Sequence, residues 1–181
     1  IQFKNKLTIE DYLVGRKFVD SLTGYRQPDF TKFAEMAIFF TERLQPWKTK
    51  LNKLLFYADF EMFRKAVHSI SGIQYQAISL GPVPYNFQSI FEYLANHDFI
   101  DVYFTEFQDG NIGEQFKPNA NRKFNPTLFN EAELEVLEKI ANRFKKTSTQ
   151  EIIEISHREK AWIENVTDKR MIDYRYSFDL L

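Results

Sequence analysis

Residues 49–68, TKLNKLLFYADFEMFRKAVH, constrain the fold more than any other segment. On a helix that advances about 100° per residue, their apolar side chains form two stripes on nearly opposite sides. The first stripe consists of Leu51, Leu54, Leu55, Ala58, Met62 and Ala66. The second consists of Phe56, Phe60, Phe63 and Val67. A helix that is apolar on two sides is buried on two sides, so this segment is predicted to be the central helix of the domain.

The polar residues of the same helix divide into two groups. Asn52 and Asp59 fall on the line between the two stripes, where both are predicted to be at least partly buried. A buried carboxylate needs hydrogen-bond partners, so Asp59 is predicted to bind backbone N–H groups or a basic side chain. The remaining face is predicted to be exposed to water, and it carries Lys50, Lys53, Tyr57, Glu61 and Arg64.

Capping residues mark the starts of the other long helices. Asp29 is placed to cap a helix that ends near Pro46. Asn130 and Ser148 are each followed three positions later by a glutamate, which is the spacing of a capping box. The segment after Ser148, TQEIIEISHREKAWIE, is predicted to continue as one helix.

Short strands are predicted between the helices. Residues 72–80 alternate in polarity and predict a strand that ends at Gly81. Pro84 is then expected in the first turn of a helix over 84–96, which makes GPVP a rigid corner between strand and helix. Two further strands are predicted within 100–118, on either side of the turn signal QDGNIG. The predicted fold class is therefore α+β and mainly α-helical, with a central helix buried on two sides and a small antiparallel sheet or hairpin.

The first 24 residues are expected to be an appendage to this domain. In LTIEDYLVGRKFVDSLTG, Thr8 and Asp11 have the spacing of a capping box, and Gly24 is the expected end of the helix. We therefore expect an N-terminal appendage helix or linker over 1–24 and a compact domain over 25–181.

Composition argues against several classes of function. The net charge is −1, whereas a domain that binds a phosphate backbone is usually basic. Cysteine is absent, which removes disulfides and thiolate metal sites and fits a reducing cytosol. No apolar run approaches the length of a membrane span, so no membrane partner is expected. Nineteen phenylalanines predict a core rich in aromatic rings.

The titratable side chains indicate neither a metal site nor a catalytic triad. The three histidines, His68, His97 and His157, lack the spacing of a metal motif. Ser156, His157 and Glu159 are neighbours on a predicted helix, where side chains so close in sequence point in different directions. No enzyme activity is therefore expected.

Two further motifs favour structural roles. We expect Trp162 to pack into the core and His157 to hydrogen-bond to a loop. The GPVP segment has a single glycine and two prolines without N–H donors, so it is a poor phosphate-binding loop. No cofactor is expected.

A winged-helix DNA-binding domain is an alternative interpretation. The order helix, strand, helix, hairpin fits it, with residues 84–96 as the recognition helix and 100–118 as the wing. However, the wing tip FQDGNIGE is acidic, and the candidate recognition helix carries no Lys or Arg. Contact with DNA phosphates would be poor, but a DNA-binding transcriptional repressor remains an alternative.

Four segments together resemble a known family. KTKLNKLLFYADF, GPVPYNFQSIFEYL, ELEVLEKIANRF and SHREKAW, in this order and at these distances, resemble the SocA-like antitoxin domain, also called the Panacea domain. The resemblance runs from about Tyr25 to the end of the chain. The motif residues expected to have structural roles are Lys50, Leu51, Leu54, Asp59, Gly81, Pro82, Pro84, His157 and Trp162.

The resemblance implies a cytoplasmic antitoxin of a bacterial or phage toxin–antitoxin system, which neutralises a cognate protein toxin by direct binding. A second alternative comes from the SocA type, in which the domain is a proteolytic adaptor for its toxin. Similar members carry an upstream helix-turn-helix part, so DNA binding is expected only through such a missing domain, and a homodimer is left open. The residues predicted to contact the toxin are Lys53, Tyr57, Glu61, Arg64, Tyr85 and Tyr93.

Overall fold

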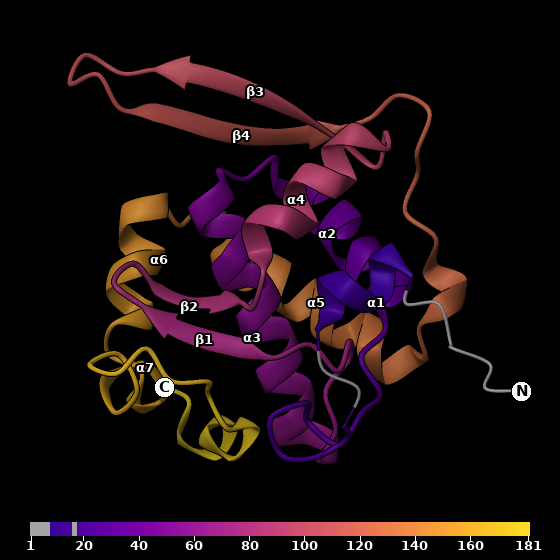
Figure 1. The fold of residues 1–181 in the computed structure, drawn as a ribbon, viewed down its shortest axis with the longest axis vertical. Coiled ribbons are helices and arrows are strands. Elements are labelled where there is room, and N and C mark those ends of the chain that lie inside the picture. The colour runs from indigo at the N-terminus through magenta and orange to yellow at the C-terminus, as the bar shows by residue number, and fades with distance from the viewer. Residues whose placement is uncertain (1–7, 16–17) are drawn as a thin grey trace, which may run out of the picture.

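One helix, α3 (Lys48–Ala66), runs through the middle of the computed structural model, which describes residues 8–15 and 18–181 (Figure 1). The described part of the chain forms a mainly helical α+β fold with two small antiparallel sheets of two strands each. The elements packed on α3 include α2 (Phe30–Leu44), α5 (Glu131–Phe144), α6 (Thr149–Ser156) and the 3-10 helix η2 (Tyr174–Asp179).

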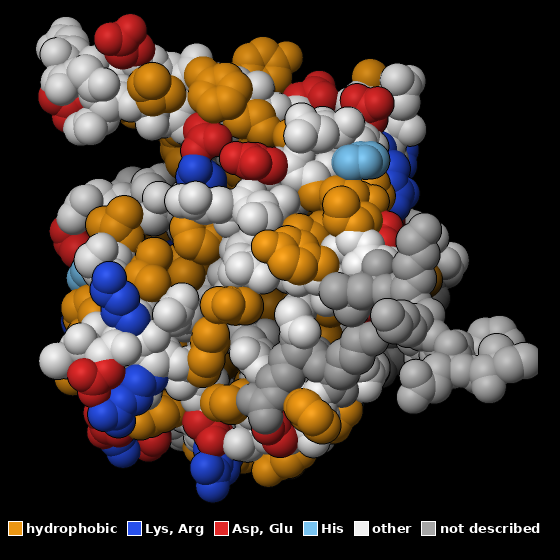
Figure 2. All heavy atoms as spheres, in the orientation of Figure 1, with side chains coloured by type: hydrophobic (Ala, Val, Ile, Leu, Met, Phe, Trp, Pro, Cys, Tyr) orange, Lys and Arg blue, Asp and Glu red, His pale blue; other side chains and the backbone are white. Residues whose placement is uncertain are grey.

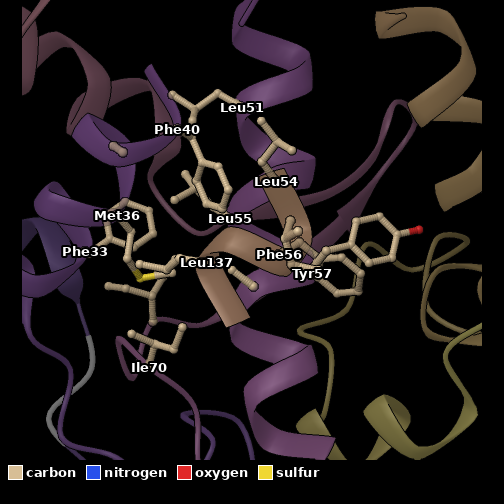
Figure 3. Close-up of a cluster of buried hydrophobic side chains, with 14 of the residues drawn as sticks. Phe33, Met36, Phe40, Leu51, Leu54, Leu55, Phe56, Tyr57, Ile70 and Leu137 are labelled. Carbon is tan, nitrogen blue, oxygen red and sulfur yellow. The ribbon is translucent and has the colours of Figure 1, made fainter. Parts of the chain in front are cut away.

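The predicted burial of α3 on two sides is confirmed. Figure 3 shows its leucine stripe beside side chains of α2, with Phe56 and Tyr57 pointing to the other side. The structure goes further, because every residue from Lys50 to Phe63 is buried. The two ends of the helix reach the surface: Lys48 and Thr49 are half-buried, and Ala66 and the C-cap residue Val67 are exposed.

The exposed face predicted for this helix is wrong. Lys50, Lys53, Tyr57 and Glu61 are buried, and Arg64 alone is half-exposed. The reason lies far away in the sequence, since α5, α6 and η2 all pack against α3. Helical periodicity describes one helix and contains no information about such distant segments.

The predicted partners of Asp59 are confirmed. One carboxylate oxygen accepts hydrogen bonds from the backbone N–H groups of Ile70 and Ser71, both at 2.8 Å. The other accepts from the Ser71 hydroxyl at 2.6 Å and from the Tyr75 hydroxyl at 2.7 Å. Burial raises the pKa of Asp59, and these hydrogen bonds oppose the rise. The side chain therefore ties the middle of α3 to the chain that follows it.

The N-terminal helix is shorter than predicted. The capping box of Thr8 and Asp11 is confirmed, but α1 (Ile9–Val14) ends at Gly15, whose φ is +76°, and not at Gly24. The predicted helix also crossed residues 16–17, which lie outside the described part. Leu13 belongs to the hydrophobic core, so α1 contacts the rest of the protein.

The GPVP segment is a strand and not a corner before a helix. It forms β2 (Gly81–Pro84), which pairs antiparallel with β1 (Tyr75–Ile78), and α4 (Phe87–Asn96) begins only later. The N–H of Tyr85 continues the pairing by donating to the Gln74 carbonyl at 2.9 Å. Pro82 and Pro84 occupy positions whose backbone nitrogen points away from β1. The strand pairing therefore does not need the N–H groups that proline lacks.

The second pair of strands was predicted correctly. It forms a hairpin of β3 (Ile100–Glu106) and β4 (Ile112–Pro118), with Phe104 paired opposite Glu114. The hairpin projects beyond the helices at the top of Figure 1. A short 3-10 helix, η1 (Pro126–Leu128), then leads to α5.

The helix predicted after Ser148 is broken in two. Its capping box and that of Asn130 are confirmed. The chain turns between α6 and α7 (Lys160–Ile163), and Glu159 lies in this turn with its carboxylate directed to Tyr57 of α3. Within the described ranges, no helix is long and apolar enough to cross a membrane.

We predict that Asp59→Ala lowers the free energy of unfolding by roughly 3 kcal/mol, because four donors lose their acceptor inside the core. Asp59→Asn should cost clearly less, since the amide oxygen can still accept from the two backbone N–H groups. Urea unfolding followed by circular dichroism gives both values. Asp168→Ala, at an exposed carboxylate, is the control. Equal stability of Asp59→Ala and this control would contradict the role of Asp59.

Candidate functional site

The motif residues meet inside the protein around Lys53. This lysine is completely buried, and its ammonium group donates to the Pro82 carbonyl at 2.9 Å. A Cβ atom on Gly81 would lie 2.5 Å from the Lys53 Cε and 2.6 Å from the Ser156 hydroxyl oxygen. Only glycine therefore fits where β2 crosses between α3 and α6.

Burial also changes the protonation of this cluster. It lowers the pKa of Lys53 to about 7. Burial lowers the pKa of His157 as well, the charge of Lys53 lowers it further, and a hydrogen bond with the Ser79 backbone opposes these effects. Two basic groups thus stand together in a region that disfavours their charged forms.

Trp162 and His157 pack together beside β1. Trp162 packs partly buried against the core, and its indole N–H donates to the Ile78 carbonyl at 2.7 Å. The His157 ring stacks on Trp162 with ring centroids 3.9 Å apart and contacts the loop at Ser79. The Ser156 hydroxyl donates to the Ile153 carbonyl at 2.8 Å, so it is engaged within its own helix.

Tyr57 is held by the turn between α6 and α7. Its hydroxyl donates to Glu159 at 2.9 Å, and the other carboxylate oxygen of Glu159 accepts from the Leu181 N–H at 3.2 Å. Burial raises the pKa values of both Tyr57 and Glu159. The guanidinium of Arg143 lies 5.0 Å from the Tyr57 ring centroid and shields this side chain from solvent.

The residues predicted to contact a toxin do not form one exposed surface. Glu61 is buried and forms ion pairs with Arg64 and Lys139. Arg64 also donates to the Leu180 carbonyl at 3.1 Å. Like Lys53 and Tyr57, these side chains of α3 are bound to other parts of the same chain.

The two predicted tyrosines lie on the other side, near α4. Tyr85 is exposed. Tyr93 is half-buried, and its hydroxyl donates to Glu10 of α1 at 3.0 Å. Of the predicted contact residues, Tyr85 is therefore exposed, and Tyr93 and Arg64 are partly exposed. Their contact with a toxin stays a prediction.

The described side chains contain no group of three or more His, Cys, Asp or Glu that could hold a metal ion. The polar cluster around Lys53 lies in the core, and Lys53, Ser156 and His157 line neither of the two pockets described below. Its members instead bring together the segments that carry the family resemblance.

An exposed apolar surface lies on the β3–β4 hairpin, which the sequence had not indicated as a site. The exposed apolar side chains of the hairpin are Tyr103, Phe104, Phe107 and Ile112. Phe104 is 69% exposed and Ile112 is 67% exposed. Figure 2 shows apolar side chains gathered on the hairpin, with carboxylates close to them.

Phe104 lies on the same face of β3 as Ile100 and Val102, because successive side chains of a strand alternate between its two faces. That face is buried at Ile100 and becomes exposed along the strand, because the hairpin extends past the helices. Adjacent large apolar residues such as Tyr103 and Phe104 were the available signal, since an alternating strand cannot bury both of them on one side.

A groove of about 550 Å³ separates the hairpin from α4 and is called the hairpin groove below. The residues that line it include Phe91, Glu92, Ile100, Phe104, Glu114 and Phe116. Phe91 and Phe116 stack edge to face with centroids 5.2 Å apart at its buried side. A second hollow of about 340 Å³ lies between the hairpin tip and Trp47. Grooves with apolar walls and a polar rim are typical of polypeptide-binding surfaces.

The comparison with protein families agrees with the motifs. The described chain is a mainly helical domain with most of its motif residues buried and an apolar hairpin exposed. Residues 51–163 match the family model described as antitoxin SocA-like, Panacea domain. The match covers more than half of the 181 residues, and the chain belongs to this family. Neither the comparison with curated proteins nor that with solved structures yields a match.

We predict that the stability of the protein rises between pH 7 and pH 9, and that Lys53→Met removes this rise. The unfolded chain keeps the Lys53 proton up to about pH 10.5, whereas the folded protein releases it near pH 7. The unfolded state therefore binds more protons in this interval, and deprotonation favours folding. The full effect up to pH 10.5 is on the order of 4 kcal/mol.

Urea unfolding at pH 7, 8 and 9 measures this difference. Lys65→Met, which changes an exposed lysine of the same helix, is the matched control and should retain the slope of the wild type. Parallel stability curves for the wild type and Lys53→Met would show that Lys53 stays charged in the folded protein.

Proposed function

We propose that this chain is the antitoxin of a toxin–antitoxin system and that it neutralises a cognate protein toxin by direct binding in the cytoplasm. The match of residues 51–163 to the SocA-like, Panacea antitoxin family carries this proposal. The absence of cysteine fits a reducing compartment. Neutralisation of this kind requires occupancy of the toxin and no chemical step.

The architecture supports binding without catalysis. The most unusual ionisable groups, Lys53, Asp59 and Glu159, are buried and hydrogen-bonded to their own chain. Neither of the two described pockets contains any of them. Such a fully packed scaffold loses little conformational entropy when it binds, which favours tight association.

The exposed hairpin supports a protein as the partner. Its large apolar side chains, Phe104 and Ile112 among them, stand in water at the edge of a groove. Aromatic and aliphatic side chains of this kind are the usual anchors of protein interfaces.

The surface charge disfavours direct DNA binding by the same region. The helix α4 has no Lys or Arg, and the hairpin tip carries Glu106 and Asp109. A winged-helix mode would bring these groups against phosphates. Repression of transcription would therefore depend on a further domain.

Co-expression tests the proposed function. We predict that a small protein encoded next to this gene stops growth when it is expressed alone, and that growth recovers by at least about tenfold in plated colonies when this chain is co-expressed. The two proteins should co-purify at equal amounts from the rescued cells. Cells that carry an empty vector in place of this chain are the control and should not recover.

Two outcomes would overturn the proposal. The first is a neighbouring protein that is not toxic, or whose toxicity this chain does not relieve. The second is rescue without any physical complex, which would indicate that the chain acts on the product of the toxin or on its gene. A gel-shift assay with the operator DNA addresses that case directly, and the described chain alone is expected not to shift the DNA.

A further inference from the structure

The hairpin groove lies in the most acidic part of the chain. Between Tyr85 and Lys117, the sequence holds six carboxylates and one lysine, which gives a formal charge of −5, whereas the whole chain carries −1. The six carboxylates belong to Glu92, Asp98, Asp101, Glu106, Asp109 and Glu114. The rest of the molecule is therefore net positive, and negative charge is concentrated at α4 and the hairpin.

The positive groups near the groove are already engaged. Lys48 forms an ion pair with Glu114 across the groove. The ammonium of Lys117 lies 4.3 Å from the centroid of the Tyr103 ring. Glu92 interacts electrostatically with the same Lys48, whereas no ion pair or hydrogen bond links Glu106 to a described side chain. Both carboxylates are exposed. The charge that the groove offers to a partner is thus negative.

The groove also exposes apolar side chains to water. Phe91 and Phe116 form its buried side, and Phe104 projects beyond them into water. The cross-strand neighbour of Phe104 is Glu114, and that of Glu106 is Ile112. Each of these two cross-strand pairs therefore places a large apolar side chain beside a carboxylate on the neighbouring strand.

We propose that the hairpin groove binds a basic, apolar-anchored segment of the toxin. A large apolar side chain of this segment packs against Phe91 and Phe104. Its Lys or Arg residues lie beside Glu92 in the groove and beside Glu106, which is outside the groove on the same face of β3 as Phe104. The assignment rests on the proposed antitoxin function, and it adds the chemistry of the partner surface. A basic surface on the toxin also accelerates association with an acidic antitoxin.

Charge complementarity selects this occupant over two others. Nucleic acid would bring phosphates against a region with a net charge of −5 from its six carboxylates and one lysine. A second copy of this chain, docked through the same surface, would oppose two such regions. Only a positively charged polypeptide satisfies both the rings and the carboxylates.

Peptide binding tests the chemistry of the groove without the toxin. The probes are a labelled 16-residue peptide of Lys and Leu in an amphipathic pattern, the same pattern with Glu in place of Lys, and the same pattern with Ser in place of Leu. Fluorescence anisotropy should show that the Lys/Leu peptide binds at least about tenfold more tightly than either of the others. The affinity should fall as salt rises, because the charge contacts are exposed.

Paired variants locate the binding surface. Phe104→Thr with Ile112→Thr removes the exposed anchors and keeps residues that favour strands, and it should weaken binding about tenfold. Glu92→Gln with Glu106→Gln should weaken binding and flatten its salt dependence. The matched controls are Leu128→Thr, an exposed leucine of η1, and Glu154→Gln, an exposed glutamate of α6, and both should bind like the wild type.

Three results would overturn the inference. The first is that the Glu/Leu peptide binds as tightly as the Lys/Leu peptide. The second is that neither paired variant, Phe104→Thr with Ile112→Thr or Glu92→Gln with Glu106→Gln, weakens binding. The third is that a double-stranded DNA probe binds more tightly than the Lys/Leu peptide. Analytical ultracentrifugation adds a fourth, since dissociation of a dimer by the Phe104→Thr and Ile112→Thr pair would show that a second copy occupies the groove.

Growth rescue by the same variants separates this inference from the proposed function. If the wild type protects cells from the neighbouring toxin and the hairpin pair does not, while Leu128→Thr does, both stand. If the hairpin pair still protects, the antitoxin function stands and the groove is not its toxin site. If the wild type itself fails to protect, the proposed function falls, and the peptide measurements alone decide the chemistry of the groove.

Discussion

Burial of α3 from Lys50 to Phe63 is the constraint on which the rest of the structure depends. The ionisable side chains of this stretch all have a partner inside the protein, because an unpaired buried charge is costly. The buried side-chain oxygen of Asn52 has no hydrogen-bond partner among the described residues. Asp59 binds the chain that follows the helix, and Lys53 binds the carbonyl of Pro82 in β2. Tyr57 binds Glu159 in the turn after α6. The polar groups of one helix therefore determine how three distant segments are placed around it.

This arrangement places the most recognisable motifs of the chain in its interior. The KLNKLLFYADF, GPVP and SHREKAW segments meet one another in the interior, where Gly81 is required by the space that Lys53 and Ser156 leave. What a family shares in such a domain is its packing. The surface that we propose for the partner lies elsewhere and combines the rings and carboxylates of the β3–β4 hairpin. A stiff interior and an exposed apolar edge are compatible with a protein that acts by holding another protein.

Several features could be predicted from the sequence because they depend on neighbouring residues. Capping boxes at Asn130 and Ser148 involve side chains three positions apart, and both formed as predicted. The need of Asp59 for partners followed from its position between two apolar stripes. The errors have the opposite origin. GPVP was expected to start a helix, because pairing with β1 cannot be seen in four residues, and the exposed face of α3 was assigned without the C-terminal segment that covers it.

The sequence by itself determined where the helices begin, that α3 is the centre of the core, and which family the chain resembles, because periodicity and capping act over a few residues. Tertiary structure alone decided which polar side chains of α3 face protein instead of water, and which apolar residues of the hairpin remain exposed. Phe104 and Ile100 occupy equivalent positions in one strand, yet only Ile100 is covered by the body of the protein. Burial depends on what packs against a residue from elsewhere in the chain, and a local pattern does not contain that information.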